Sequence, residues 1–99
     1  MKKLFISQPM RGKTDEEILK ERKVLVAKAE ERTGEKFEVL ETFFADAPTD
    51  ARPLWYLGKS LEYLADADLA VFALDWPSAR GCRIEHEAAV QYGIATMEV

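Results

Sequence analysis

Cysteine and histidine are nearly absent from this sequence, which has one of each, Cys82 and His86. A single cysteine excludes a disulfide within the chain and any cysteine-rich zinc site. The two residues lie four positions apart and can share a helix face, but two candidate ligands without a third are weak evidence for a metal. We therefore expect no metal site, and we expect Cys82 to be a small packing residue.

Long basic tracts and long apolar runs are also missing. The net charge is −4 and no Lys/Arg run exceeds two residues, which argues against duplex nucleic acid as a partner because its affinity comes from clustered basic side chains. No apolar run approaches the roughly 20 residues of a membrane span, and the one before Ser7 is too short for a signal peptide. We expect a cytoplasmic protein without a membrane segment.

The remaining composition is that of an ordinary globular protein, with 47% hydrophobic and 32% charged residues. The length of 99 residues predicts one domain spanning 1–99. The net charge does not exclude a small anionic ligand, since such a ligand needs only one local positive site.

Three stretches have helical patterns. In the first, Thr14 and Glu17 fit a capping box and Gly34 fits the residue that ends a helix. Its predicted inner face consists of Ile18, Arg22, Leu25, Val26 and Ala29. A second helix begins near Pro53, with a predicted buried stripe made of Leu54, Leu57, Leu61 and Leu64. The third covers about 82–92.

Four apolar runs, 3–7, 37–40, 69–74 and 94–99, alternate with these helices. The run LAVFAL at 69–74 is typical of a central parallel strand that is covered on both faces. Right-handed crossovers then predict an α/β fold, a three-layer, doubly wound, flavodoxin- or Rossmann-like arrangement with a four-stranded parallel sheet in the order 2-1-3-4. The switch point lies between strands one and three, so the loops 8–13 and 75–83 should converge on a ligand site.

Glu85 is the first candidate for chemistry at this edge. A carboxylate can attack an electrophilic sugar carbon, and we expect the positive end of the third helix to keep it ionised. The alternative is a solvated glutamate that only complements the helix dipole. His86 is adjacent but points about 100° away around the helix, which favours a surface or packing role.

The two loops supply further candidates. In Gln8–Gly12, backbone N–H groups and the Arg11 guanidinium can hold an anion, although an ordinary turn with an exposed arginine fits the same residues. In the second loop, Gly81 would let the backbone approach a ligand and Ser78 would bond a phosphate or a sugar hydroxyl, or would serve only as a turn residue.

Three aspartates flank the third strand. Asp75, at its C-terminal end, is best placed to meet substrate, whereas Asp66 and Asp68 lie at the other end and fit structural roles. An aromatic set around the central loop could stack on a base, though core or subunit packing is the simpler use; it consists of Phe43, Phe44, Trp55 and Tyr56.

Three stretches, LFISQPMRG, LADADLAVFALDW and SARGCRIEHEAA, together resemble the nucleoside 2-deoxyribosyltransferase-like superfamily, closest to a small uncharacterised bacterial and phage branch. The Gly81-to-Glu85 spacing is similar to the family's Ser-x-Gly-x-x-x-Glu-type motif, which makes Glu85 the nucleophile. The resemblance implies a nucleoside or nucleotide substrate, no cofactor and a homo-oligomer, with Phe43, Phe44 and Trp55 as candidates for the contact.

The implied reaction is a retaining displacement at C1′ through a glycosyl-enzyme, ending in hydrolysis or transfer to another base. The resemblance further assigns the sugar or 5′-phosphate end of the substrate to Ser7, Gln8, Met10, Arg11, Gly12, Ser78, Arg80 and Gly81. The sequence departs from the family in two places, at Glu87, where a small glycine is usual, and near Ser60, where a catalytic aspartate is expected. Two acids could substitute for that aspartate: Glu62, which is out of register with the motif, and Asp75, which we take as the candidate. The alternatives are a non-catalytic nucleotide-binding module and a small interaction protein.

Overall fold

The structure, a computed structural model, describes residues 1–44 and 46–99. Along these residues the helices and strands follow in the order β1 (Lys2–Ser7), α1 (Asp15–Thr33), β2 (Phe37–Val39), α2 (Pro53–Leu64), β3 (Leu69–Phe72), the short 3-10 helix η1 (Trp76–Ser78), α3 (Arg80–Gln91) and β4 (Ala95–Glu98).

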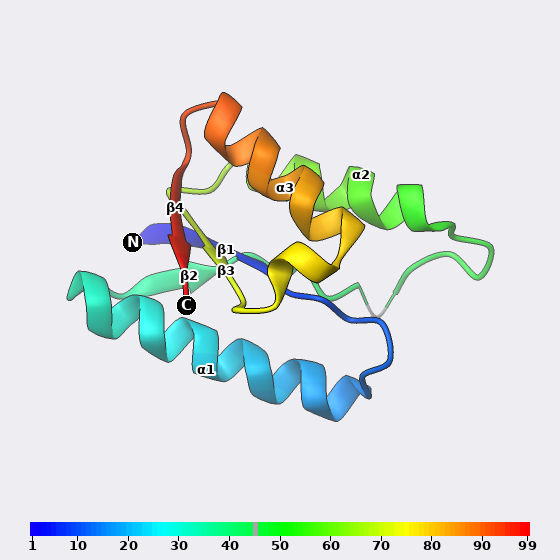
Figure 1. Ribbon diagram of the computed structural model, residues 1–99, viewed down its shortest axis with the longest axis horizontal. Helices are drawn as coiled ribbons and strands as arrows, with labels where there is room; N and C mark the ends of the chain where they lie inside the picture. Colours follow the sequence, from blue (N-terminus) through cyan, green and yellow to red (C-terminus); the bar gives the residue numbers. More distant parts are fainter. Residues whose placement is uncertain (45) are drawn as a thin grey trace.

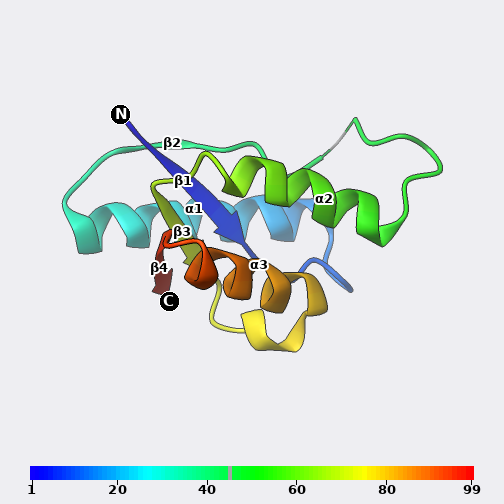
Figure 2. The same cartoon turned by 90° about the horizontal axis from the view of Figure 1, so that it is seen from above.

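The four strands form one parallel sheet in the order β2-β1-β3-β4, which confirms the predicted topology. In the centre of the sheet Ser7, the last residue of β1, is in register with Phe72, the last residue of β3. Helix α1 lies on one side of the sheet and α2 and α3 lie together on the other (Figures 1 and 2). The chain is therefore a three-layer, doubly wound α/β fold.

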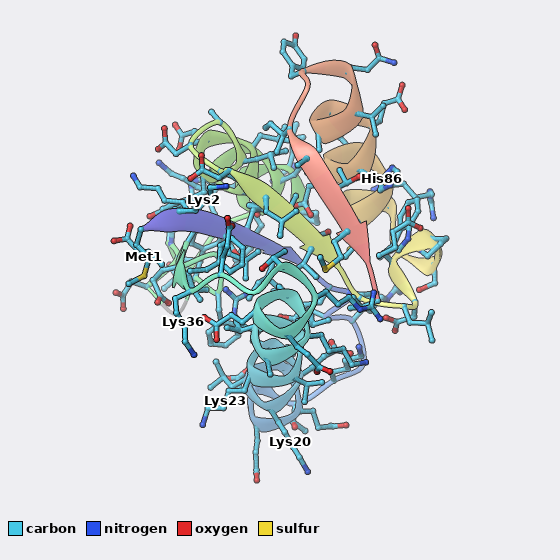
Figure 3. All side chains as sticks on the ribbon, turned by 90° about the vertical axis from the view of Figure 1, so that its left-hand side faces the viewer. Met1, Lys2, Lys20, Lys23, Lys36 and His86 are labelled. Atoms are coloured by element: carbon cyan, nitrogen blue, oxygen red, sulfur yellow. The ribbon has the colours of Figure 1, made fainter. Side chains whose placement is uncertain are left out.

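The ends of α1 follow the sequence pattern. The Thr14 side chain accepts a hydrogen bond from the Glu17 N–H, and the Glu17 side chain accepts one from the Thr14 N–H. Gly34 closes the helix with φ 71°, a left-handed conformation that glycine adopts at little cost. The outer face carries lysines such as Lys20 and Lys23, which extend into solvent (Figure 3).

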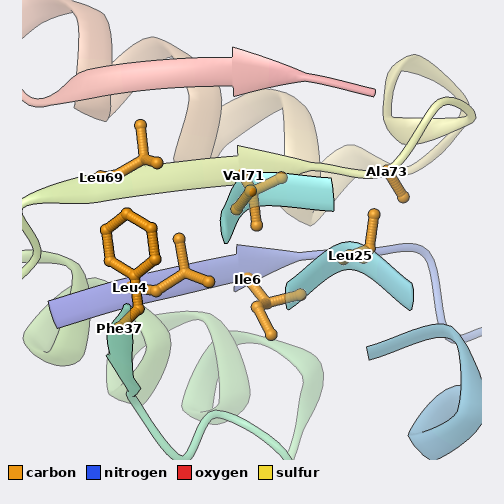
Figure 4. Packing of buried hydrophobic residues seen from close by; sticks show 8 residues of the cluster. Leu4, Ile6, Leu25, Phe37, Leu69, Val71 and Ala73 are labelled. Carbon is orange, nitrogen blue, oxygen red and sulfur yellow. The ribbon is translucent and has the colours of Figure 1, made fainter. Parts of the chain in front are cut away.

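The core has two halves because the central strands bury both faces. On the α1 side, Leu4 and Ile6 of β1 pack with Val71 of β3 and Leu25 of α1 (Figure 4). On the other side Phe5 packs with a second cluster that includes Leu40, Leu64, Ala70, Phe72 and Ala89. Burial on both faces explains why β3 is an unbroken apolar run rather than an alternating one.

Some predicted boundaries and buried positions were wrong. Strand β3 ends at Phe72, and Leu74 is 84% exposed, because the chain turns out of the sheet after Ala73. Leu54 was predicted to be buried but is 75% exposed, because the first turn of α2 projects beyond the sheet (Figure 2). Helix α3 begins at Arg80, two residues earlier than predicted. In the part of the chain that the structure describes, no helix has the length and apolar character to cross a membrane.

Candidate functional site

A cleft of about 800 Å³ opens at the carboxyl ends of the strands. Its walls are formed by the segment after β1, the start of α1, the segment after β2, residues 53–60 of α2 and the first half of α3. It lies at the predicted switch point, where β1 and β3 are neighbours whose following helices lie on opposite faces of the sheet.

Glu85 lies in this cleft and is joined to the end of β1. Its carboxyl group is on α3, only 8% of the residue is exposed, and Oε1 accepts a 2.7 Å hydrogen bond from Ser7 Oγ. Ser7 itself is 1% exposed. The alternative of a solvated glutamate that only complements the dipole is therefore wrong.

Burial raises the pKa of Glu85 to about 7, and hydrogen bonding to the hydroxyls of Ser7 and Ser60 offsets only part of that effect. We expected the helix dipole to keep this carboxylate ionised. That expectation was wrong, because Glu85 is the sixth residue of α3 and the dipole acts mainly within the first turn. Near neutral pH the group can therefore either hold or release a proton.

The family resemblance expects a catalytic aspartate near Ser60, and the Ser60 side chain faces the same cleft. It is 8% exposed on α2 and lines the cleft with Glu85. The carboxyl side chains that line the cleft are those of Asp15 and Glu85. Among the described lining residues, Glu85 is thus the one buried carboxyl group.

The loop after β1 borders the cleft through a tight turn. The Lys13 N–H donates to the Met10 carbonyl at 3.1 Å, and Gly12 has φ 80°, the conformation that the third residue of a type II turn requires. Met10, Arg11 and Lys13 line the cleft, so this loop brings two cationic side chains to it.

Gln8 lines the cleft, but its amide group is engaged by α1. Its Nε2 donates to Glu21 Oε1 at 2.7 Å and to the Ile18 carbonyl at 3.3 Å, and its Oε1 accepts from Arg22 Nη1 at 3.3 Å. Gln8 therefore fixes the loop against α1, a contact that no sequence pattern predicted.

Arg22 is 7% exposed and joins α1 to the segments that follow the carboxyl ends of β1 and β2. Besides Gln8 it donates to Thr42 Oγ1 at 3.3 Å and to the Leu40 carbonyl at 3.2 Å. Its place on the inner face of α1 was predicted, but its bridging role was not. An arginine at an apolar position of a helix was the available signal.

The second loop reaches the cleft only at its end. Gly81 lines the cleft, whereas Asp75, Ser78 and Arg80 are exposed and are not among its described lining residues. Asp75 Oδ2 instead lies 3.4 Å from Lys13 Nζ, and Ser78 Oγ donates to the Asp75 carbonyl at 2.7 Å.

The cause of this displacement is η1, which turns the loop toward the edge strand. Trp76 Nε1 donates to Glu98 Oε1 of β4 at 3.1 Å, and the Trp76 ring stacks on His86 with centroids 4.1 Å apart. His86, on the side of α3 next to β4 (Figure 3), also has its Nε2 3.4 Å from Glu98 Oε2. His86 therefore has a packing role on this side of α3, as its helical position suggested.

Cys82 lies beside Glu85 in the cleft and is 4% exposed. Burial raises the pKa of its thiol to about 11, so it stays protonated near neutral pH and fits the packing role expected for it. Within residues 1–44 and 46–99, no group of three His, Cys, Asp or Glu side chains could hold a metal ion.

Further cleft residues were not predicted as site residues. They include Thr42 after β2 and Leu57 on α2. The aromatic set divides between two places, since Tyr56 lines the cleft, Trp55 lines a second pocket, and Phe43 and Phe44 border both. The burial of Ser60 between leucine positions of α2 was a usable signal that this helix bears on the site.

Comparison of the chain with family models, with curated proteins and with solved structures finds no match. Function is therefore inferred from the geometry of the cleft and from the resemblance carried by the sequence motifs.

Proposed function

We propose that the protein cleaves the N-glycosidic bond of a nucleoside or nucleotide, as an N-glycosidase or 2-deoxyribosyltransferase, with Glu85 as the nucleophile. The observation that carries the proposal is the buried Glu85 carboxyl group, held by Ser7 in an 800 Å³ cleft at the carboxyl edge of the sheet. The motif resemblance assigns the same residue to the same role.

In the proposed reaction the ionised Glu85 carboxylate attacks C1′ while the C1′–N bond breaks and its electron pair leaves with the base. Ser7 Oγ donates to one carboxylate oxygen and orients the group. Water then attacks C1′, the ester bond to Glu85 breaks, and the sugar keeps the hydroxyl while a proton is released. A second base in place of water gives transfer instead of hydrolysis.

The departing base takes a proton from solvent in this scheme. Asp75, the substitute acid suggested by the sequence, lies outside the cleft lining and reaches it only through its ion pair with Lys13. Arg11 and Lys13 are placed to meet a phosphate or other anionic end of a substrate, while Tyr56 offers an aromatic face to a base. No cofactor takes part.

Product analysis tests this proposal. The protein is incubated with ribo- and deoxyribonucleosides and their 5′-monophosphates, with and without an acceptor base, and released base is quantified by liquid chromatography. We expect release by the native chain and none by Glu85→Gln, whose amide oxygen can still accept the bond from Ser7. Equal release by both proteins would contradict the nucleophilic role.

A non-catalytic nucleotide-binding module is the second candidate. Ser60 favours it, because the position expected to hold an acid offers only a hydroxyl group and leaves Glu85 as the one buried carboxyl in the described cleft lining. Under this alternative nucleotides raise the melting temperature, no base is released, and Glu85→Gln binds a nucleotide as well as the native chain or better.

We further propose that the protein is cytoplasmic and forms a homo-oligomer. Leu54 is 75% exposed and Tyr56 is 41% exposed on the first turn of α2, and Tyr56 lines the cleft. A second copy that covers these side chains would bury apolar surface and narrow the cleft. Light scattering after size exclusion tests it, with Leu54→Lys expected to shift the mass toward the monomer.

A further inference from the structure

A second pocket, of about 600 Å³, lies between α2 and the segment after β2. On the helix its lining includes Trp55, Lys59, Glu62 and Tyr63. They share one face because Trp55, Lys59 and Tyr63 follow at intervals of four and Glu62 comes three residues after Lys59. The proposed glycosidase uses none of these four side chains.

Three aromatic rings form one wall of this pocket. The Phe44 centroid lies 5.9 Å from that of Trp55, with the planes at 80°, and 5.7 Å from that of Tyr63. All three residues are only half-buried, so ring surface remains accessible in the pocket. Such surfaces accept methylene groups and attract cations to their π-faces.

The charges around the rings are mostly negative. Four carboxylates, those of Glu41, Asp46, Glu62 and Asp66, and one ammonium, that of Lys59, line the pocket, which leaves three negative charges in excess. The Lys59 side chain shows how the pocket treats an alkylammonium group. Its Nζ lies 3.2 Å from Glu62 Oε2 and 6.0 Å from the Trp55 ring centroid.

The carboxylates come from two separate segments: Glu62 and Asp66 belong to the last turn of α2 and the residues after it, and Glu41 and Asp46 belong to the segment after β2. The lining on α2 is long, since Trp55 and Glu62 are seven residues, or about 10 Å, apart. A compact cation cannot use such a set, and within the described residues no three carboxylates come close enough to hold a metal ion. An alkyl chain that carries two or more ammonium groups can pair with carboxylates of both segments and cover the rings between them.

We infer that this pocket binds a linear aliphatic diamine or polyamine. The ammonium groups pair with carboxylates of the two lining segments, and the methylene chain packs on Phe44, Trp55 and Tyr63. A neutral chain of the same length lacks the ion pairs, and an inorganic dication lacks the apolar contact. The pocket should therefore prefer a ligand that has both ammonium groups and a methylene chain over a ligand that has only one of these features.

Calorimetric titration of the unmodified chain with spermidine at low ionic strength tests the inference. We expect saturable binding, no comparable heat from 1,8-octanediol, and no competition from magnesium chloride at equal charge concentration. Tryptophan fluorescence of the Trp76→Phe variant locates the bound spermidine, because Trp55 is then the one remaining tryptophan. We expect Trp55 emission to change with spermidine concentration along the same saturation curve as the heat of binding.

A charge-matched pair of variants separates a pocket from general attraction to an acidic protein. Glu41→Gln/Asp66→Asn removes two pocket carboxylates, and Glu31→Gln/Glu87→Gln removes two exposed ones on α1 and α3. We expect the first pair to weaken spermidine binding by roughly tenfold or more and the second to leave it nearly unchanged.

Three results would each overturn the inference: spermidine binding that does not saturate, spermidine binding that both variant pairs weaken equally, and displacement of spermidine by magnesium at equal charge concentration. Base release from nucleosides is measured separately, so failure of this site leaves the proposed glycosidase activity untouched and the reverse also holds.

Discussion

Ser7 and Glu85 lie 78 residues apart in the chain and meet in a buried hydrogen bond, with Oγ donating to Oε1 at 2.7 Å. The bond joins the end of β1 to the second turn of α3, across the point where the sheet changes winding direction. It places a carboxyl group with a pKa of about 7 in an open cleft. Four predictions concern this group and its surroundings.

The first concerns stability as a function of pH. The pKa of Glu85 is about 7 in the folded chain and near the ordinary 4.5 when unfolded, so the folded state binds more protons between these values. Its contribution to the free energy of unfolding is complete below about pH 4.5 and is lost as the pH rises through 7, a change of about 3 kcal/mol.

Glu85→Gln lacks that pH-dependent loss. In urea unfolding we expect it to match the native chain near pH 5 and to exceed it at pH 8, with exposed Glu87→Gln as the control. The prediction is wrong if the difference between Glu85→Gln and the native chain is the same at both pH values.

The second prediction concerns Ser7→Ala. The Ser7 hydroxyl lowers the pKa of Glu85, so its removal should raise that pKa further above 7. Carbon NMR of the Glu85 carboxyl group measures this pKa directly. The ascending limb of the pH–rate profile for base release should move to higher pH by the same amount. Ser78→Ala, the same change outside the cleft, should leave both unchanged.

The third prediction tests whether Asp75 is needed for base release as Glu85 is. Asp75→Asn removes a half-exposed ion pair with Lys13, which is worth about 1 kcal/mol or less. Because the departing base takes its proton from solvent in the proposed reaction, we expect base release and stability both to change little. A loss of base release comparable to that of Glu85→Gln would instead make Asp75 the leaving-group acid.

The fourth prediction concerns the loops that frame the cleft. Arg22→Ala leaves three acceptors, in Gln8, Leu40 and Thr42, without their buried donor, and should reduce the free energy of unfolding by about 3 kcal/mol or more. Lys20→Ala, on the exposed face of the same helix, should cost less than about 0.5 kcal/mol. Equal costs in thermal unfolding would show that the network contributes nothing.

The fold was predictable because its signals are local and agree with one another. The Thr14 capping box, the left-handed Gly34 and the two-sided apolar strands each specify one element, and right-handed crossovers then leave few topologies. A cleft at the carboxyl ends of β1 and β3 also followed from topology alone.

The rest of the site depends on packing that no local pattern reports. Ser78 and Arg80 were expected at the ligand, but the bond from Trp76 to Glu98 turns their loop toward β4. The high pKa of Glu85 results from burial by segments that are distant in sequence. The spacing of residues within α3 carries no information about that burial.

Covalent trapping at Glu85 tests its nucleophilic role most directly. A panel of 2′-deoxy-2′-fluoroarabinonucleosides, whose glycosyl-enzymes hydrolyse slowly, is incubated with the native chain, and the protein is analysed by intact mass spectrometry and peptide mapping. We expect the mass of one fluorosugar on the peptide that contains Glu85, and none on Glu85→Gln. Base release without any adduct, or an adduct on another residue, would contradict a nucleophilic Glu85.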